Sequence, residues 1–367
     1  FGLFKRAWRI WLVIASAVML VVQYSPARDV FGVAVSGIAL AALYALLQWG
    51  SARLFLAARK RGMNRSALYL TLLFNLLPLL CAKFIPLQWP DYPLFFLGLS
   101  YVTFRALDVT IGIQDGLIQE VKAIPYLTFL LFFPTISSGP IDRYRRFNED
   151  WVRERNREQF AQDVDSGIHK IFTGFLYKFI LAALIQQHWL DPLTGTTVVL
   201  QTLSYMYGYT FYLFFDFAGY SAFAIGFSYT LGIHTPENFN LPFLSRDIRE
   251  FWNRWHMSLS FWFRDNIYNR FVFAAVKGKW FKTSQTASYF GYLLTMGLMG
   301  LWHGTAAHYI VYGFYHAALL IGTNWYDKKY KGNRLLNDTG LAWQVSSIAI
   351  TFHLVAFGLL IFSGRLF

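Results

Sequence analysis

The sequence predicts an all-helical, polytopic membrane protein, and three observations lead to that fold class. Hydrophobic residues make up 56% of the 367 residues and aromatic residues 20%, whereas only 14% are charged. A soluble domain carries about 25% charged residues. The apolar residues also gather in long uncharged runs, and Lys and Arg gather between those runs. Both patterns are typical of helices that cross a bilayer and of the loops that join them.

The longest uncharged run covers residues 283–326, where 44 residues pass without Asp, Glu, Lys or Arg. At about 1.5 Å of helical rise per residue, this length is enough for two crossings of a ~30 Å hydrocarbon core. Further apolar runs bring the expected total to about ten crossings. They cover residues 10–22, 30–50, 66–82, 92–104, 123–141, 171–190, 192–215, 217–236 and 339–364.

Basic residues outnumber acidic residues by 33 to 20, which gives a formal net charge of +13. Such an excess can reflect nucleic acid, anionic lipid or an acidic protein partner. In so apolar a chain the positive-inside rule accounts for most of it, and this argues against nucleic-acid binding. The expected cytoplasmic loops contain the basic clusters, which are Lys5 to Arg9, Arg53 to Arg65, Arg143 to Arg146, Lys277 to Lys282 and Lys328 to Arg334.

A single membrane domain over residues 1–367 is the simplest division, because no repeat of about 20 to 50 residues and no low-complexity tract interrupts the chain. Residues 142–166 form the longest polar interval and are expected to be a cytoplasmic segment between two bundles. Residues 1–27 faintly imitate a secretory signal, but no initiator Met is present. We interpret them as an internal transmembrane helix of a chain whose start is missing. Cys81, the only cysteine, excludes a disulfide framework and a thiolate metal site.

Residues 242–271 predict an amphipathic helix that is too charged to cross lipid. Ser245 is the expected N-cap, with Asp247 in the first turn. Apolar residues then recur at helical spacing, and Glu250 and Arg254 form an i, i+4 pair on the opposite face. The aromatic stripe and the flanking arginines favour a helix at the membrane surface or under the bundle. This helix carries His256.

Two histidines are candidates for chemistry, because ionisable groups at lipid depth are costly and mark functional pathways. His303 lies between Trp302 and Gly304 near the middle of the long uncharged run, where a neutral imidazole could act as a general base. The alternative is that His303 only hydrogen-bonds a neighbouring helix. His256 could orient a substrate or stabilise an oxyanion, or it could simply snorkel at the interface.

Other ionisable residues in apolar segments allow weaker hypotheses. His308 and His316 do not share one helical face with His303, and no acidic residue is near in sequence, so no metal site is expected. Asp216, between two phenylalanines, must be paired, hydrated or protonated, and could bind a substrate or a helix. Motifs for dinucleotides, nucleotides, serine hydrolases and zincins are absent from the sequence. Two classes remain: an acyltransferase with an imidazole base, and a transporter or flippase with a proton relay.

The histidine pair also lies in longer motifs. They read RDIREFWNRWHMSLSFW at residues 246–262 and WHG at residues 302–304, followed by YGFYH at residues 312–316. In this order and spacing the chain resembles the membrane-bound O-acyltransferase family. Three more motifs resemble its D-alanine-transferring branch of Gram-positive bacteria, and the resemblance extends over residues 66–367. They read SYVTFR at residues 100–105, FPTISSGPIDRYRRF at residues 133–147 and FFDFAGY at residues 214–220.

This resemblance implies a fold of about ten transmembrane helices with interfacial helices around a central tunnel, in the bacterial cytoplasmic membrane. It implies that D-alanine arrives as a thioester on the phosphopantetheine arm of a small acidic carrier protein. The alanyl group would end on teichoic acid hydroxyls outside, through other membrane proteins of the same pathway, and the chain itself would bind no cofactor. His303 would be the base and His256 its partner. A polysaccharide O-acetyltransferase of the same family is the alternative within the enzyme class.

Further site residues follow from these expectations. Asn253, Trp302 and Asp216 are the candidate substrate-binding residues, and the amide of Asn253 or the ring of His256 is the expected donor to an oxyanion.

A possible docking site for the carrier protein lies next to a basic cluster. Val272, Phe273 and Val276 form a small apolar patch just before Lys277 and the lysines that follow it. Hydrophobic contact with electrostatic steering suits an acidic partner, although an ordinary interfacial anchor would have the same composition.

Overall fold

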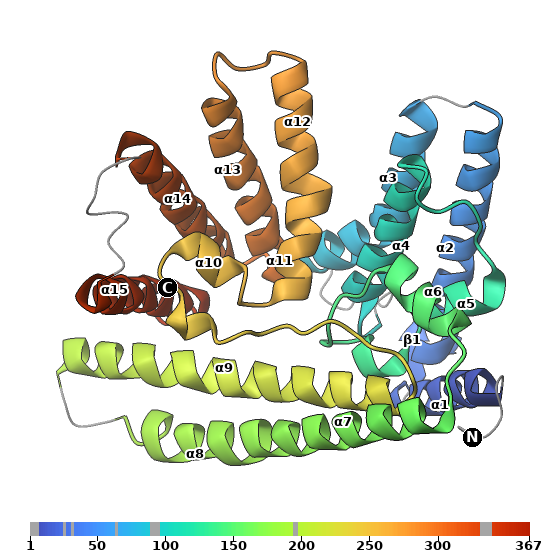
Figure 1. The fold of residues 1–367 in the computed structure, drawn as a ribbon, viewed down its shortest axis with the longest axis horizontal. Coiled ribbons are helices and arrows are strands. Elements are labelled where there is room, and N and C mark those ends of the chain that lie inside the picture. Colours follow the sequence, from blue (N-terminus) through green and yellow to red (C-terminus); the bar gives the residue numbers. More distant parts are fainter. Residues whose placement is uncertain are drawn as a thin grey trace. The chain divides into compact units, whose positions relative to one another are not determined.

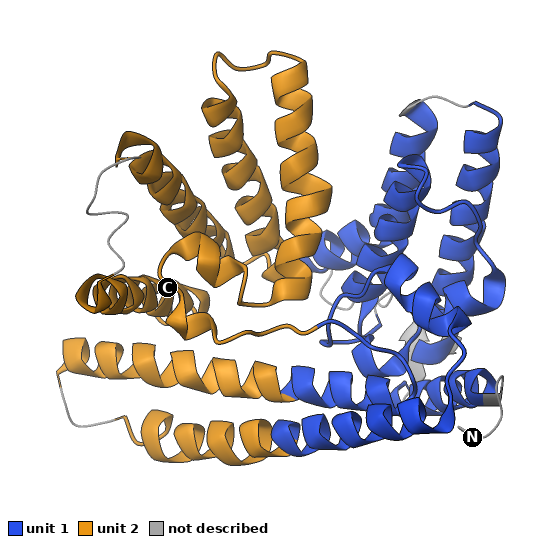
Figure 2. Ribbon diagram, in the orientation of Figure 1, with its two compact units in different colours: residues 1–174, 220–236 blue, residues 175–219, 237–367 orange. Residues whose placement is uncertain are grey.

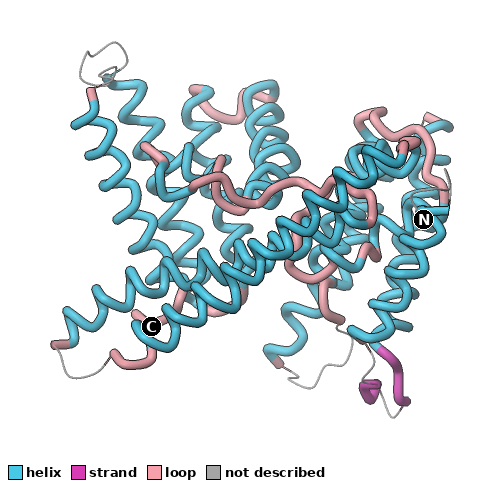
Figure 3. Tube along the Cα trace, turned by 60° about the horizontal axis from the view of Figure 1, so that its bottom comes forward, coloured by secondary structure: helices cyan, strands magenta, loops and turns pink. Residues whose placement is uncertain are grey.

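The structure is a computed structural model that describes residues 7–24, 27–30, 33–62, 65–88, 96–193, 197–330 and 340–367. In these ranges the chain is helical apart from one short antiparallel hairpin of β1 (Ala27–Val30) and β2 (Val33–Ser36) (Figures 1 and 3). The predicted all-helical membrane class is confirmed. Residues 1–6, 92–95, Lys331 and Arg334, which belong to predicted spans and basic clusters, lie outside the described residues.

The chain divides into two compact units (Figure 2). Unit 1 contains residues 1–174 and 220–236, and unit 2 contains residues 175–219 and 237–367. Unit 1 holds α1 (Ala7–Gln23), α2 (Gly37–Lys60), α3 (Arg65–Phe84), η1 (Ile85–Leu87), α4 (Leu99–Gln114), α5 (Ala123–Leu130), η2 (Phe133–Thr135), α6 (Tyr144–Val152) and most of α7 (Arg157–Phe175).

Unit 1 has a hydrophobic core, and a buried arginine next to this core hydrogen-bonds the backbone of two other segments. The guanidinium of Arg105 donates to the carbonyl oxygens of Phe129 at 2.8 Å and Thr135 at 2.7 Å. A buried cation requires such hydrogen bonds because it has left water. Arg105 therefore joins α4 to the end of α5 and to η2, in two of the motifs that carry the family resemblance.

The polar interval at residues 142–166 is only partly exposed. Asp150, on α6, is buried and pairs with Arg146 at 2.9 Å and Arg155 at 3.2 Å. Its carboxylate also accepts from the backbone N–H of His234 at 2.8 Å, and the His234 ring contacts Asp163 at 2.6 Å. Mixed charges in this segment thus serve packing inside unit 1 rather than solvation alone.

Unit 2 begins with the π-helical turns η3 (Leu176–Ala182) and η4 (Gln186–Leu190) around α8 (Ala183–Ile185), which continue α7. It then contains the first part of α9 (Val198–Thr230), whose remainder belongs to unit 1. The elements that follow are η5 (Pro242–Leu244), α10 (Ile248–Trp252), α11 (Met257–Phe263), η6 (Arg264–Tyr268), α12 (Asn269–Lys277), α13 (Ser284–His303), α14 (Ala307–Tyr330) and α15 (Leu341–Phe362).

Five helices in the described ranges are long and apolar enough to cross a membrane. They cover residues 37–60, 66–87, 157–190, 198–230 and 341–362, so the expected number of about ten crossings is not confirmed. One expectation is wrong: the two predicted spans at 192–215 and 217–236 share the single 33-residue helix α9. Asp216, which separates the two predicted spans, lies inside this helix and forms an ion pair with Lys178.

Large apolar side chains cover the outside of these helices. On the helix of residues 157–190 only 11% of the most apolar window is buried, and Phe172 and Phe179 are exposed. Side chains of this kind in contact with water would form apolar patches far larger than a soluble monomer shows. Hydrocarbon is the solvent that suits them.

Candidate active site

A close pair of helices holds the first candidate residue. Helices α13 and α14 pack where Gly300 faces the backbone of Tyr309, because an added Cβ at Gly300 would lie 2.3 Å from the Tyr309 carbonyl oxygen. Gly313 is equally close to the backbone of Met296, at 2.4 Å. Glycines allow this close approach of two helices because they have no side chain. The contact lies less than one turn before His303, the last residue of α13.

Aromatic rings surround His303, which is half-buried. The edge of its imidazole meets Phe362 of α15 at a centroid distance of 4.9 Å and Trp302 at 4.6 Å. Tyr309 and Tyr312 of α14 lie at 6.2 and 6.3 Å. These rings restrict the orientation of the imidazole and exclude part of the solvent around it, which a positioned base needs.

His256 lies at a break in the chain rather than within a continuous helix. The predicted single helix at residues 242–271 is wrong, because α10 ends at Trp252 and α11 begins at Met257. Its N-cap is Asp247, not Ser245: the Asp247 carboxylate accepts from the backbone N–H groups of Arg249 and Glu250. The Ser245 hydroxyl instead donates to the carbonyl oxygen of Pro242 at 2.7 Å.

The backbone at His256 adopts a left-handed conformation, with φ of 43°. A residue other than glycine pays strain energy there, and such positions gather at functional sites. The side chain is 3% exposed and its ring meets Phe217 edge-on at 4.7 Å and Trp302 at 6.2 Å. Trp302 therefore contacts both histidines, and the structure brings His256, Trp302 and His303 together.

Burial, and then the nearby His303, lower the pKa of His256 well below its usual 6.5. The ring is consequently neutral at physiological pH. Its Nε2 has no hydrogen-bond partner among the described residues, although it is buried. Buried polar atoms normally have partners, so this ring nitrogen beside a second histidine is a candidate contact for a ligand.

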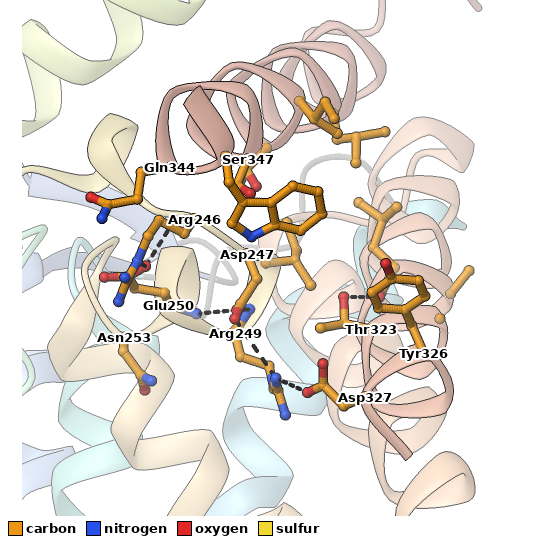
Figure 4. A pocket seen from close by; sticks show the side chains of 18 residues that line it. Arg246, Asp247, Arg249, Glu250, Asn253, Thr323, Tyr326, Asp327, Gln344 and Ser347 are labelled. Atoms are coloured by element: carbon orange, nitrogen blue, oxygen red, sulfur yellow. Dashed lines mark hydrogen bonds and ion pairs between the residues drawn. The ribbon is translucent and has the colours of Figure 1, made fainter. Parts of the chain in front are cut away.

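Two cavities flank α10. The larger, of about 970 Å³, lies between α10, α14 and α15, and Asn253 is on its wall (Figure 4). The smaller, of about 240 Å³, is lined by α10, α11, η6, α13 and one residue of α14. Asn253 belongs to both walls and accepts from Arg264 at 3.5 Å. Trp252 and Met299 line the smaller cavity, each one turn before a candidate histidine in sequence.

Asp216 lies on α9, where it forms an ion pair with Lys178 of η3. Both side chains are half-buried. The pairing accounts for a carboxylate in an apolar helix, as the sequence requires. The sequence does not predict Lys178 as the partner of Asp216, because no local pattern connects it to a residue 38 positions away.

The predicted docking patch is on α12 and is mostly exposed. Phe273 is 70% exposed and Val276 is 48% exposed, whereas Val272 is partly buried near Gly291 of α13. Trp280, which the sequence-based patch omits, is 59% exposed beside the lysines. Exposed apolar side chains and lysines thus lie together where α12 ends and the turn to α13 begins.

His308 and His316 do not join His303 in a metal site. His316 is buried among Phe251, Trp252 and Tyr312, with neither ring nitrogen hydrogen-bonded in the part of the chain that the structure describes. The ring of His308 lies tilted against that of Tyr309, at a centroid distance of 4.0 Å. Within the described ranges no three His, Cys, Asp or Glu residues are close enough to hold a metal ion.

Comparison with known proteins identifies the family of this two-histidine site. Residues 62–363 match the model of the membrane-bound O-acyltransferase family. The chain belongs to that family. The match includes both histidines and parts of both compact units, so the protein is a membrane-embedded acyltransferase.

Within this family, the chain is similar to proteins of two kinds. The teichoic acid D-alanyltransferase of Bacillus subtilis is 47% identical over 324 residues, which are 85% of this chain and 82% of the relative. The protein of that name from Streptococcus thermophilus is 43% identical, over 84% of this chain and 78% of the relative. A probable alginate O-acetylase of Pseudomonas aeruginosa is 34% identical, over 73% of this chain and 49% of the relative.

Proposed function

We propose that this acyltransferase moves D-alanine from a thioester on a phosphopantetheinyl carrier protein towards the hydroxyl groups of teichoic acid. The identity of 43% to 47% to relatives named teichoic acid D-alanyltransferase, over more than four fifths of the chain, carries the proposal. The paired histidines supply the chemistry, because transfer of an acyl group to a hydroxyl needs a base and a stabilised oxyanion.

In this mechanism the neutral imidazole of His303 accepts the proton of the acceptor hydroxyl. The oxygen then attacks the thioester carbonyl carbon and forms a tetrahedral intermediate. When that intermediate collapses, the C–S bond breaks, the new ester remains, and the sulfur takes the proton back from His303. The aromatic rings around His303 favour this role, because they hold the imidazole in place and limit competing hydrolysis.

His256 is the proposed donor to the oxyanion. Its lowered pKa keeps the ring neutral, so one ring nitrogen bears a proton and the other does not. In the tautomer with the proton on Nε2, that unpaired atom donates to the carbonyl oxygen as negative charge develops. Trp302, between the two rings, would then fix their separation. Asn253 and Asp216 are proposed to bind parts of the substrate farther from the reacting carbonyl group.

The donor is proposed to reach the histidines through the smaller cavity. Thr295, Met296 and Met299 of α13 line it with Trp252, so it follows α13 in the direction of His303. A narrow and largely apolar passage suits the extended phosphopantetheine arm. The carrier protein itself would dock on Phe273 and Val276 next to the α12 lysines, and other D-alanylation proteins of the membrane would take the product onward.

Transfer of acetyl to a polysaccharide is the weaker candidate. The alginate O-acetylase relatives share the family but only 32% to 35% identity, and the chain spans about half of their length. A transporter would move its substrate and leave the covalent bonds unchanged.

A test compares membranes that contain the wild type, His303→Ala or the control His353→Ala, supplied with D-alanyl carrier protein. His353 is exposed on α15, and its ring contacts a backbone carbonyl. Mass spectrometry should find D-alanyl ester formation reduced at least about 100-fold by His303→Ala and unchanged by the control. Full transfer by His303→Ala at equal protein levels contradicts the proposal, as does acetyl in place of alanyl on the product.

A further inference from the structure

The cavity of about 970 Å³ in unit 2 is separate from the proposed path of the donor, and only Arg249 and Asn253 line both cavities (Figure 4). Its walls are the N-terminal part of α10, the second half of α14 and the first half of α15. An added Cβ at Gly322, on the α14 wall, would meet no atom within 4 Å. This wall is therefore open rather than packed against a neighbour.

One end of the cavity is apolar. Leu319 and Ala318 on α14 and Ile350 and Leu354 on α15 line it, and Ile350 is 62% exposed. Helix α15 is one of the candidate membrane spans, so this end faces hydrocarbon. Water has no hydrogen-bond partners in such a space, whereas the methylene groups of an acyl chain fill it favourably. The apolar end thus suits a lipid tail.

The opposite end is polar but already electrically balanced (Figure 4). Arg249 is paired with Asp327 and lies 3.7 Å from Asp247, and Arg246 lies 3.6 Å from Glu250. Arg254 pairs with Glu250 from beside the lining at 2.8 Å, so three arginines face three carboxylates and the cluster has no formal net charge. A phosphate would have to displace these carboxylates, so an anionic headgroup is disfavoured.

Hydroxyl groups are the better match for this polar end. Each hydroxyl donates and accepts, so it can bond carboxylates and arginines without breaking their pairs. Gln344, Ser347 and Thr323 add uncharged groups to the same lining. Trp343 and Tyr326 also line the cavity, and flat aromatic faces contact the C–H groups of sugar rings.

We propose that this cavity binds a glycolipid, with one acyl chain along α14 and α15 and an uncharged sugar headgroup beside α10. Lys328 and Lys329 follow the polar end directly, which assigns the site to the cytoplasmic leaflet. Arg249 and Asn253 also line the smaller cavity, so the headgroup would stabilise the turn that carries Trp252. The proposal does not depend on which acyl group the enzyme transfers.

The test uses delipidated full-length protein in detergent and three lipids with identical acyl chains: monoglucosyl diacylglycerol, phosphatidylglycerol and phosphatidylethanolamine. Native mass spectrometry counts the retained lipid. Gly322→Leu fills the open wall, and Gly50→Leu is the matched control, since an added Cβ at Gly50 of α2 also meets nothing within 4 Å. The wild type and the control should retain the glucolipid in preference to the two phospholipids.

Gly322→Leu should retain the glucolipid about tenfold less, because displacing roughly two methylene groups of the lipid tail changes affinity by that factor. Thermal unfolding in detergent alone confirms that both variants are folded. Equal retention by Gly322→Leu and the wild type overturns the proposed site. Equal retention of either phospholipid overturns the proposed headgroup, and no retained lipid in the wild type overturns both.

Discussion

At the scale of single residues, the site consists of two imidazoles with different surroundings. His303 ends a helix and is half-buried among rings, whereas His256 is held in a strained backbone conformation and is almost fully buried. Environments that differ in this way are consistent with the different roles proposed for the two histidines. Trp302 contacts both, so its replacement should disturb each of them.

Burial of a neutral His256 should make the folded state sensitive to acid. Its folded pKa lies below the unfolded value of 6.5, so the stability it contributes is complete above that pH and is lost as the pH falls. The loss begins near pH 6.5, because the unfolded chain then gains a proton that the folded protein does not. His256→Gln should therefore flatten the decrease of the unfolding temperature below this pH, measured in detergent.

The control for this prediction is His169→Gln, because the His169 side chain is 77% exposed. It should leave the pH dependence of unfolding unchanged. If the unfolding temperature falls equally with pH in the wild type and in His256→Gln, then His256 accepts a proton in the folded protein without loss of stability, and the prediction is wrong.

At the scale of helices, the α13 to α14 contact decides where His303 lies. Gly300→Ala should destabilise the protein by about 1 to 3 kcal/mol, since the new methyl group meets backbone that cannot rotate away. It should also reduce transfer, because the shift separates His303 from Tyr309 and Tyr312. Unfolding temperature and D-alanyl transfer measure the two effects. Gly322→Ala, which meets open space, should be neutral or slightly stabilising, and equal behaviour of the two variants would contradict the prediction.

The α12 patch gives a second prediction at this scale. Phe273→Asp combined with Val276→Asp should weaken binding of the acidic carrier protein at least about tenfold, because both apolar contact and charge complementarity are lost. Val152→Asp is the control, since Val152 is similarly exposed at the end of α6. Binding of the immobilised carrier measures the effect, and unaltered binding would leave the patch as an interfacial anchor. Val272 is less suitable, because it is partly buried.

At the scale of the whole molecule, the basic clusters predict which ends of the helices face the cytoplasm. In a Cys81→Ser background, Lys279→Cys and Lys329→Cys should react with a membrane-impermeant maleimide in inside-out vesicles and remain unlabelled in intact cells. Both lysines are exposed. Labelling from the outside, or from opposite sides for the two positions, would contradict the predicted orientation.

Much of the architecture and part of the site could be predicted from the sequence. The apolar runs indicated membrane helices, and the motifs around His256 and His303 indicated the family that comparison then showed. The Glu250 to Arg254 pair is confirmed at 2.8 Å, although Arg254 lies in the turn that follows α10 rather than in one continuous helix. The roles of the site residues stay predictions.

Contacts between distant segments could not be predicted. The single helix expected around His256 is broken, and local periodicity carries no sign of the left-handed residue that breaks it. The partner of Asp216 and the tyrosines beside His303 come from other helices. One-dimensional spacing determines faces within a helix, but not which faces of different helices meet.

The sequence by itself therefore determined the membrane environment, the helical class and the choice of two candidate histidines, because hydropathy, charge and motif are properties of neighbouring residues. Only the tertiary structure decided that Trp302 joins the two imidazoles, that Nε2 of His256 is buried without a described partner, and that a large cavity opens between α14 and α15. Burial and proximity depend on packing across the chain, which long-range contacts alone establish.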